Sequence, residues 1–211
     1  MNTAATRELG YIRYITVTAI MSAVAVVLQL LEFPLPFLIP PFIKFDFSEL
    51  PALISSFAMG PLSGILVCLI KNLVKLLTSS TGGVGELANF LIGIFLVGTA
   101  GFIYKYNRTR KGAFIACLAG SLAMAVMSIP VNYFISYPVY TKFMPLDTII
   151  GMYQELNPNV DGLLGCLIVF NLPFTFLKGA ADSLITFFIY KSLSPIIKGT
   201  GRRGSRASGQ A

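Results

Sequence analysis

Four polar side chains share one face of the last apolar stretch of the sequence. They are Asn171, Thr175, Lys178 and Asp182, at offsets of 0, 4, 7 and 11. That spacing places all four on the same side of an α-helix. A charge at the centre of a membrane-spanning helix costs roughly 2.5–3.5 kcal/mol on insertion scales, so such groups usually have a function. A polar seam between helices, with Lys178 paired to Asp182 one turn away, is the structural explanation. For Lys178 we favour ligand binding.

Two other apolar stretches carry similar polar groups at the same depth. Glu86, Asn89 and Gly93 share one face near the start of their stretch, and Asn132 lies near the end of the next one. Amides both donate and accept hydrogen bonds, so with one fixed cation they suit a neutral heterocycle that bears carbonyls and ring nitrogens. Such a site rejects analogues, because each unmet buried polar group costs about 1–3 kcal/mol. The predicted site on these stretches comprises Glu86, Asn89, Gly93, Asn132, Asn171, Thr175 and Lys178.

The segment 32–46 is a stiff apolar loop with four prolines and four phenylalanines. Proline fixes the backbone and prevents a helix here. An apolar loop at a surface needs cover, which lipid could provide if the loop is an interfacial anchor. The alternative is a lid over a flat aromatic ligand, where each ring contact adds about 0.5–1.5 kcal/mol. In that interpretation Phe37, Leu38 and Phe42 contact the ligand.

Composition requires a membrane environment for the elements that carry these residues. The chain of 211 residues is 55% apolar and 12% charged, whereas soluble domains carry about 25% charged residues. Stretches of roughly 20 apolar residues cross a bilayer as helices. We therefore predict an all-α membrane protein, with a single domain over 1–198 and a disordered basic tail at 199–211. Its six transmembrane helices are expected at 11–31, 47–59, 62–77, 86–104, 113–137 and 163–193.

The basic residues indicate the orientation of these helices. Eleven of the sixteen Lys and Arg residues fall before the first helix, between the fourth and fifth, or after the sixth. With six crossings all three groups share one side, which the positive-inside rule assigns to the cytoplasm. Both termini are then cytoplasmic, and the Pro/Phe-rich first loop and the polar cluster lie towards the outside. We expect a multi-pass protein of the bacterial plasma membrane.

Several function classes are excluded by residues that the sequence lacks. It contains no histidine, which removes the commonest general base and metal ligand. It also lacks the GxxxxGK[ST] loop that binds ATP phosphates. The net charge of +7 lies next to the membrane, where topology and anionic lipid explain it better than nucleic acid does. We predict no catalytic residues, no metal site and no enzymatic function.

Two further features concern packing. Lys71 lies in the middle of the third stretch, and we favour a structural ion pair for it. Its candidate partners are Asp46, Glu49 and Glu86. In the first stretch, Ala19 and Ala23 are small residues four apart, which allow close helix approach within the protein or docking to a partner.

The segments that carry these residues resemble the riboflavin-specific substrate-binding (S) components of energy-coupling factor (ECF) transporters. The most specific block is Asp-Phe-Ser-Glu-Leu-Pro-Ala at 46–52, directly after the Pro/Phe-rich loop. Further similar segments lie at 60–64, 70–72, 85–90 and 173–179, and the resemblance extends roughly over residues 11–195.

The resemblance implies a six-helix protein that captures riboflavin from outside. A transmembrane coupling protein and two ATPase subunits would be its partners, and they would use the ATP, so the chain would need no cofactor of its own. By position, Asn132 and Lys178 would contact the polar edge of the flavin, and Ala19 and Ala23 would match the coupling motif of the first helix. Thr175 departs from the asparagine found in many relatives, a loss for which Asn171 can compensate.

Three alternatives stay open. The chain could be an S component for another vitamin. A stand-alone secondary carrier would need a coupling-ion site, and no inverted repeat is evident in the sequence. A membrane enzyme would have to use Lys178 or Asp182.

Overall fold

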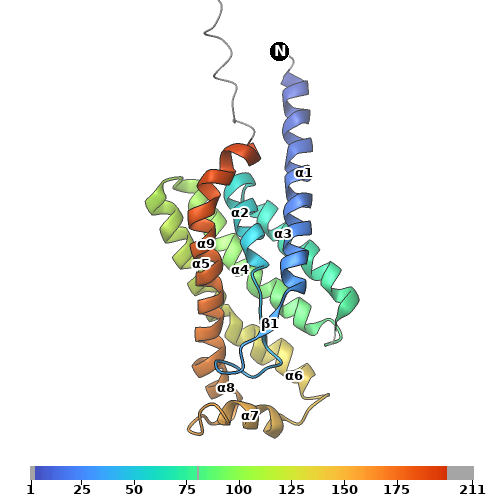
Figure 1. Ribbon diagram of the computed structural model, residues 1–211, viewed down its shortest axis with the longest axis vertical. Helices are drawn as coiled ribbons and strands as arrows, with labels where there is room; N and C mark the ends of the chain where they lie inside the picture. The colour runs from blue at the N-terminus through green and yellow to red at the C-terminus, as the bar shows by residue number, and fades with distance from the viewer. Residues whose placement is uncertain (1–2, 80, 199–211) are drawn as a thin grey trace, which may run out of the picture.

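The computed structural model describes residues 3–79 and 81–198, which form an all-α bundle with one short antiparallel strand pair (Figure 1). The tail predicted at 199–211 lies outside the described residues. The helices are α1 Thr3–Leu30, α2 Glu49–Met59, α3 Pro61–Lys75, α4 Val84–Tyr106, α5 Arg110–Val131, α6 Tyr137–Tyr140, α7 Leu146–Gln154, α8 Gly162–Cys166 and α9 Leu172–Lys198. The strands are β1 Phe33–Pro34 and β2 Lys44–Phe45.

Five helical stretches of the described chain are long and apolar enough to cross a membrane. They are Glu8–Leu30, Pro61–Thr78, Val84–Tyr106, Arg110–Tyr140 and Gly162–Tyr190. The sixth predicted crossing, α2, is apolar but has only 11 residues, about 16 Å of helix at 1.5 Å per residue. The predicted all-α fold with long apolar helices is therefore confirmed, with five helices long enough to cross a membrane and one short one.

The break between α2 and α3 follows from two adjacent residues. Gly60 has φ 107°, in the range that side-chain-bearing residues rarely adopt. Pro61 then occupies the first turn of α3, where its missing N–H costs nothing. A close approach elsewhere also needs glycine, because a Cβ at Gly120 of α5 would lie 2.8 Å from the Leu96 carbonyl oxygen of α4.

Two apolar clusters hold the bundle together. The larger one lies between α2, α3, α4 and α5 and includes the fully buried Leu53, Val67 and Leu96. The smaller one lies beneath the connection 31–48, called loop 1 below, and includes Ile39 and Phe45 of that loop. Loop 1 thus closes the end of the bundle opposite the start of α1 (Figure 1).

The segment 138–162, which lies between the fifth and sixth predicted helices, contains the further helix α7. This helix lies across the same end of the bundle as loop 1 (Figure 1). Only Ile149 and Tyr153 of its nine residues are buried, which is too little apolar periodicity to reveal a helix in the sequence.

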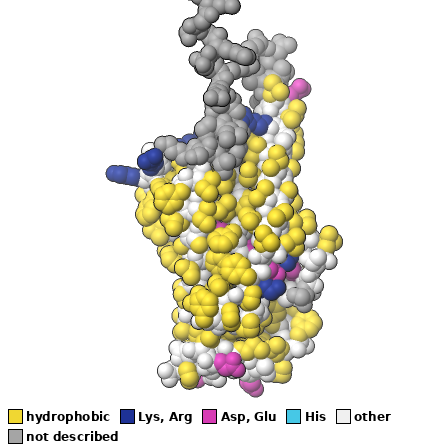
Figure 2. Space-filling view, in the orientation of Figure 1, with side chains coloured by type: hydrophobic (Ala, Val, Ile, Leu, Met, Phe, Trp, Pro, Cys, Tyr) yellow, Lys and Arg dark blue, Asp and Glu magenta, His cyan; other side chains and the backbone are white. Residues whose placement is uncertain are grey.

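The outer surface of the bundle is predominantly apolar. Figure 2 shows hydrophobic side chains along the length of the helices, with Lys and Arg side chains near the end where α1 begins. Helix α1 is the most exposed of the five long stretches, with 17% of its apolar window buried. Ala19 and Ala23 are both on its exposed surface.

Candidate functional site

A cavity of about 360 Å³ lies under loop 1, between the ends of the long helices. Its volume is within the range of about 300–1,000 Å³ of small-molecule sites. Residues of α1, loop 1, the α3–α4 connection, α4, α5 and α9 line it. They include Gln29, Glu32, Phe42, Ile43, Lys44, Asp46, Lys75, Thr78, Thr81, Glu86, Asn89, Ile92, Met124, Asn132, Ser136, Tyr137, Tyr140, Asn171, Phe174, Thr175 and Lys178.

Seven of the ten ligand-site residues predicted from the sequence lie around this cavity. They come from four separate segments of the chain, and the bundle brings them together. The seven are Phe42, Glu86, Asn89, Asn132, Asn171, Thr175 and Lys178.

The other three predicted residues do not line the cavity. Between the paired strands, loop 1 buries Ile39 but leaves the two residues before it on the surface. These two residues, Phe37 and Leu38, are 71% and 38% exposed. Gly93 faces α3, because a Cβ there would lie 3.4 Å from the Cys68 sulfur.

A buried ion cluster forms the inner end of the site. Lys178 Nζ lies 2.8 Å from Asp46 Oδ2 and 3.2 Å from Glu49 Oε2. Lys71 Nζ lies 2.6 Å from Glu49 Oε1 and also donates to Ser48 Oγ. Glu49 therefore bridges two lysines from different helices, α3 and α9.

These contacts decide two predictions. The ion pair of Lys71 is confirmed, with Glu49 as its partner. The pairing of Lys178 with Asp182 is wrong, because Asp46 of loop 1 reaches the ammonium group instead. Burial alone would raise the pKa of Asp46, but the charges of Lys178 and Lys71 outweigh it and hold that pKa below its ordinary value.

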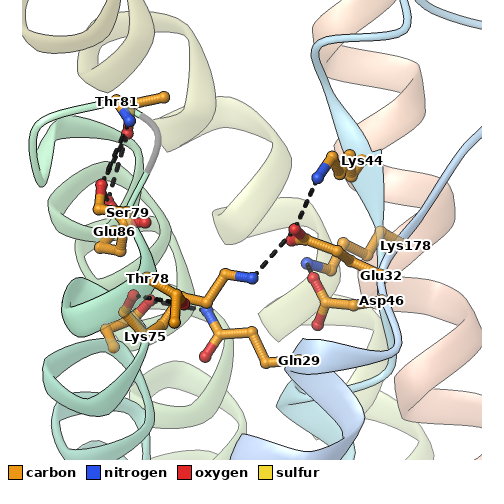
Figure 3. Close-up of polar contacts among 11 residues, drawn as sticks. Gln29, Glu32, Lys44, Asp46, Lys75, Thr78, Ser79, Thr81, Glu86 and Lys178 are labelled. Carbon is orange, nitrogen blue, oxygen red and sulfur yellow. Dashed lines mark hydrogen bonds and ion pairs between the residues drawn. The ribbon is translucent and has the colours of Figure 1, made fainter.

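The mouth of the cavity carries a second ionic group (Figure 3). Glu32 Oε1 accepts hydrogen bonds from Lys44 at 2.8 Å and Lys75 at 3.0 Å, which ties loop 1 to the end of α3. Partial burial opposes ionisation of Glu32, but the two lysines outweigh it and lower its pKa. Glu86 is held by the hydroxyls of Ser79 at 2.7 Å and Thr81 at 3.2 Å.

Two π-helical turns, Asn132–Ser136 and Leu167–Asn171, interrupt the long helices at the level of the cavity. Such turns insert one extra residue per turn and are frequent at functional sites. Asn171 accepts a hydrogen bond of 2.7 Å from Tyr153 of α7. Among the described residues, no hydrogen bond involves the side chain of Asn132, which faces the cavity half-buried.

The sequence reasoning missed several lining residues. Asp46 was considered only as a partner for Lys71, although a lone carboxylate at the end of an apolar loop is a signal in itself. The fifth predicted helix ends at Tyr137 and leaves Tyr140 outside it, and the π-helical turn before these two residues has no signature in the sequence. Phe42 packs edge-on against Tyr140 and Tyr153, with ring centroids 6.3 and 6.4 Å apart.

Residues 13–190 match the family model described as ECF transporter, substrate-specific component. The chain is 34% identical over 186 residues to the riboflavin transporter RibU of Staphylococcus aureus, covering 88% of this chain and 92% of that protein. It is 32% identical over 190 residues to the riboflavin transporter FmnP of Bacillus subtilis, covering 89% and 95%. A solved S component of a bacterial ECF transporter superposes with a TM-score of 0.69 at 32% identity, covering 88% of this chain and 97% of that one.

Proposed function

Because the chain belongs to the family of substrate-specific components of ECF transporters, we propose that it binds riboflavin in the cavity beneath loop 1. The resemblance drawn from the sequence is confirmed by this membership. The chain is accordingly a multi-pass membrane protein with a transport role, and it is not an enzyme. Two relatives described as riboflavin transporters support the choice of ligand.

The cavity opens to the outside of the cell in this proposal. The basic residues of the α4–α5 connection, Lys105, Arg108, Arg110 and Lys111, favour the cytoplasmic side for that end of the bundle. Loop 1 and the cavity lie at the opposite end, and the space-filling view shows acidic side chains at the tip of that end (Figure 2). Both termini are then cytoplasmic, and α2 completes a six-helix arrangement with the five long helices.

Polar groups without protein partners carry the proposal. The Asn132 amide has no hydrogen bond among the described residues, and the Asn89 amide has only a 3.4 Å contact with Lys71. Both line one cavity with Lys178, so the carbonyls and nitrogens of a heterocycle can satisfy them. Phe42 and Phe174 offer aromatic surface for the ring system.

The charges around the cavity favour a neutral ligand. Lys71 and Lys178 are matched by Asp46 and Glu49 at the inner end. At the mouth, Lys44 and Lys75 share Glu32, and Glu86 is a further carboxylate. An anionic ligand would therefore enter without a free cation to compensate its charge.

The energy for transport comes from partners in this proposal. A transmembrane coupling protein and two ATPase subunits of an ECF module would use ATP, and this chain would hold only the ligand. Ala19 and Ala23 lie exposed on α1, the most exposed long helix, so small residues are available for close contact with a partner helix.

A fluorescence titration of the purified full chain with riboflavin tests the ligand. Flavin fluorescence should be quenched on binding, at one riboflavin per chain. A panel of other vitamins as competitors should leave the quenching unchanged. Quenching that is lost to another vitamin, or absent at micromolar riboflavin, would contradict the proposal.

A further inference from the structure

A carboxyl group without a partner lies inside the bundle, one turn from the ligand site. Asp182 of α9 is 0% exposed, and within residues 3–79 and 81–198 neither of its oxygens has a hydrogen-bond partner. The hydroxyl of Thr186, one turn further along, is also unpartnered. A buried ionised carboxylate without a partner is too costly to keep, so such a group takes up a proton or gains a cation.

The charged groups around Asp182 come from four elements. Loop 1 contributes Asp46, α2 contributes Glu49, α3 contributes Lys71, and α9 itself contributes Lys178; the thiol of Cys68 on α3 is a further titratable group nearby. Helix α5 packs against the same stretch with Cys117, whose thiol donates to the Ser183 carbonyl at 3.6 Å. The interior of the described chain thus holds three carboxylates and two lysines.

Those five charges do not balance while loop 1 is closed. Lys178 and Lys71 are paired with Asp46 and Glu49, and in the described part of the chain no further buried cation remains to pair with Asp182. The interior is neutral only if Asp182 carries a proton.

Loop 1 supplies one of the three carboxylates, so the excess of buried negative charge depends on whether the loop is closed. Asp46 is anchored to the loop, where its Oδ1 accepts from the Ser48 N–H at 2.8 Å. When loop 1 lifts from the bundle, the Asp46 carboxylate moves into water. The interior then holds two carboxylates, Glu49 and Asp182, and two lysines. Lys178 then loses its 2.8 Å partner and has Asp182 one turn away on the same helix.

We propose that Asp182 is a proton-binding site coupled to the position of loop 1. With the loop closed, Asp46 pairs with Lys178 and Asp182 holds the proton. When the loop opens, the O–H bond of Asp182 breaks, the proton leaves through the opened cavity, and the carboxylate pairs with Lys178, which stays an ammonium ion. The site rests on the proposed function only in taking loop 1 as the cover of the ligand cavity.

The position of loop 1 can be measured against pH without any ligand. Spin labels at Pro36→Cys on the exposed turn of loop 1 and Leu87→Cys on the exposed face of α4 report their separation. The three native cysteines are buried, so the introduced ones are labelled selectively. The full chain in lipid nanodiscs is measured from about pH 5 to about pH 9, the range in which buried carboxyl groups titrate.

Closure that takes up one proton changes the ratio of open to closed loop up to tenfold per pH unit, with opening at high pH. Asp182→Asn mimics the protonated acid, so the loop should stay closed at every pH. Asp46→Asn balances the closed interior with Asp182 ionised, so it should also abolish the pH dependence. Asp147→Asn, an exposed acid on α7, should leave the native response unchanged.

Infrared spectra provide a second measurement that does not need a spin label. The closed native protein should show a protonated carboxyl band that is missing in Asp182→Asn and in Asp46→Asn. A loop position that ignores pH in the native protein, or a native pH response that persists in Asp182→Asn, would overturn the proposal. If Asp182→Asn does not fold, a native pH response in Asp46→Asn would overturn it equally. A failure to bind riboflavin alongside the predicted pH response would overturn only the proposed ligand.

Discussion

Replacing Asn132 with alanine should weaken riboflavin binding without destabilising the protein. The reason is the absence of any hydrogen bond from its side chain to the described protein residues, although it lines the cavity. The free protein therefore loses no side-chain hydrogen bond within the described residues when the amide is removed. The bound complex loses the hydrogen bonds that the amide makes to the ligand.

The size of the effect follows from that loss. A ligand polar group left unmet in a buried site costs about 1–3 kcal/mol, which is a roughly 5- to 150-fold rise in Kd. The melting temperature of the ligand-free protein should not fall, since alanine is a better helix former than asparagine and no side-chain hydrogen bond to the described residues is broken.

Two measurements on the same preparation separate binding from stability. Fluorescence titration gives the Kd, and a thermal unfolding scan without ligand gives Tm. Asn159→Ala is a matched control, because Asn159 is an exposed asparagine outside the cavity. An unchanged Kd, or a Tm that falls together with affinity, would refute the assignment of Asn132 to the ligand.

Three further changes test the rest of the site. Lys178→Ala should raise the Kd and also lower Tm, because the buried Asp46 loses its cation at a cost of about 3–5 kcal/mol, while Glu49 keeps Lys71; a native Tm in thermal unfolding would contradict this. Ala19→Leu combined with Ala23→Leu should keep riboflavin binding but abolish co-purification with the ECF module, and transport that survives would exclude these residues from docking. Glu32→Gln should cost up to about 1 kcal/mol at pH 7. Its difference in Tm from the native protein should disappear as the pH falls from the unfolded pKa of about 4.3 through the lower folded pKa of Glu32, and a constant difference would refute the ionic role.

Most of the architecture could be predicted from local pattern. The long apolar stretches and the Gly60-Pro61 break are properties of short windows of sequence, so helices and their junction were located correctly. The segment 146–154 was not, because it buries only two side chains of one short helix. The π-helical turns that present Asn132 and Asn171 depend on packing at the end of the bundle, and no residue pattern announces them.

The residues that line the cavity could be predicted where helical periodicity controls their direction, and only in part where the loop does. Seven predicted residues converge because each lies on an inward helix face or in the loop that covers it. Phe37 and Leu38 are exposed and do not line the cavity, whereas Ile39 beside them is fully buried. An apolar loop has no period from which its inner and outer sides can be read.

Sequence alone determined that this protein lies in a membrane and that several costly polar groups sit in its helices, because hydropathy and helical spacing are local properties. Only the tertiary structure decided which carboxylate neutralises which lysine. Lys178 has Asp182 four residues away but pairs with Asp46, which is 132 residues distant along the chain. A loop can bring a charged side chain to any helix end that it covers, and which helix end it covers depends on the whole fold.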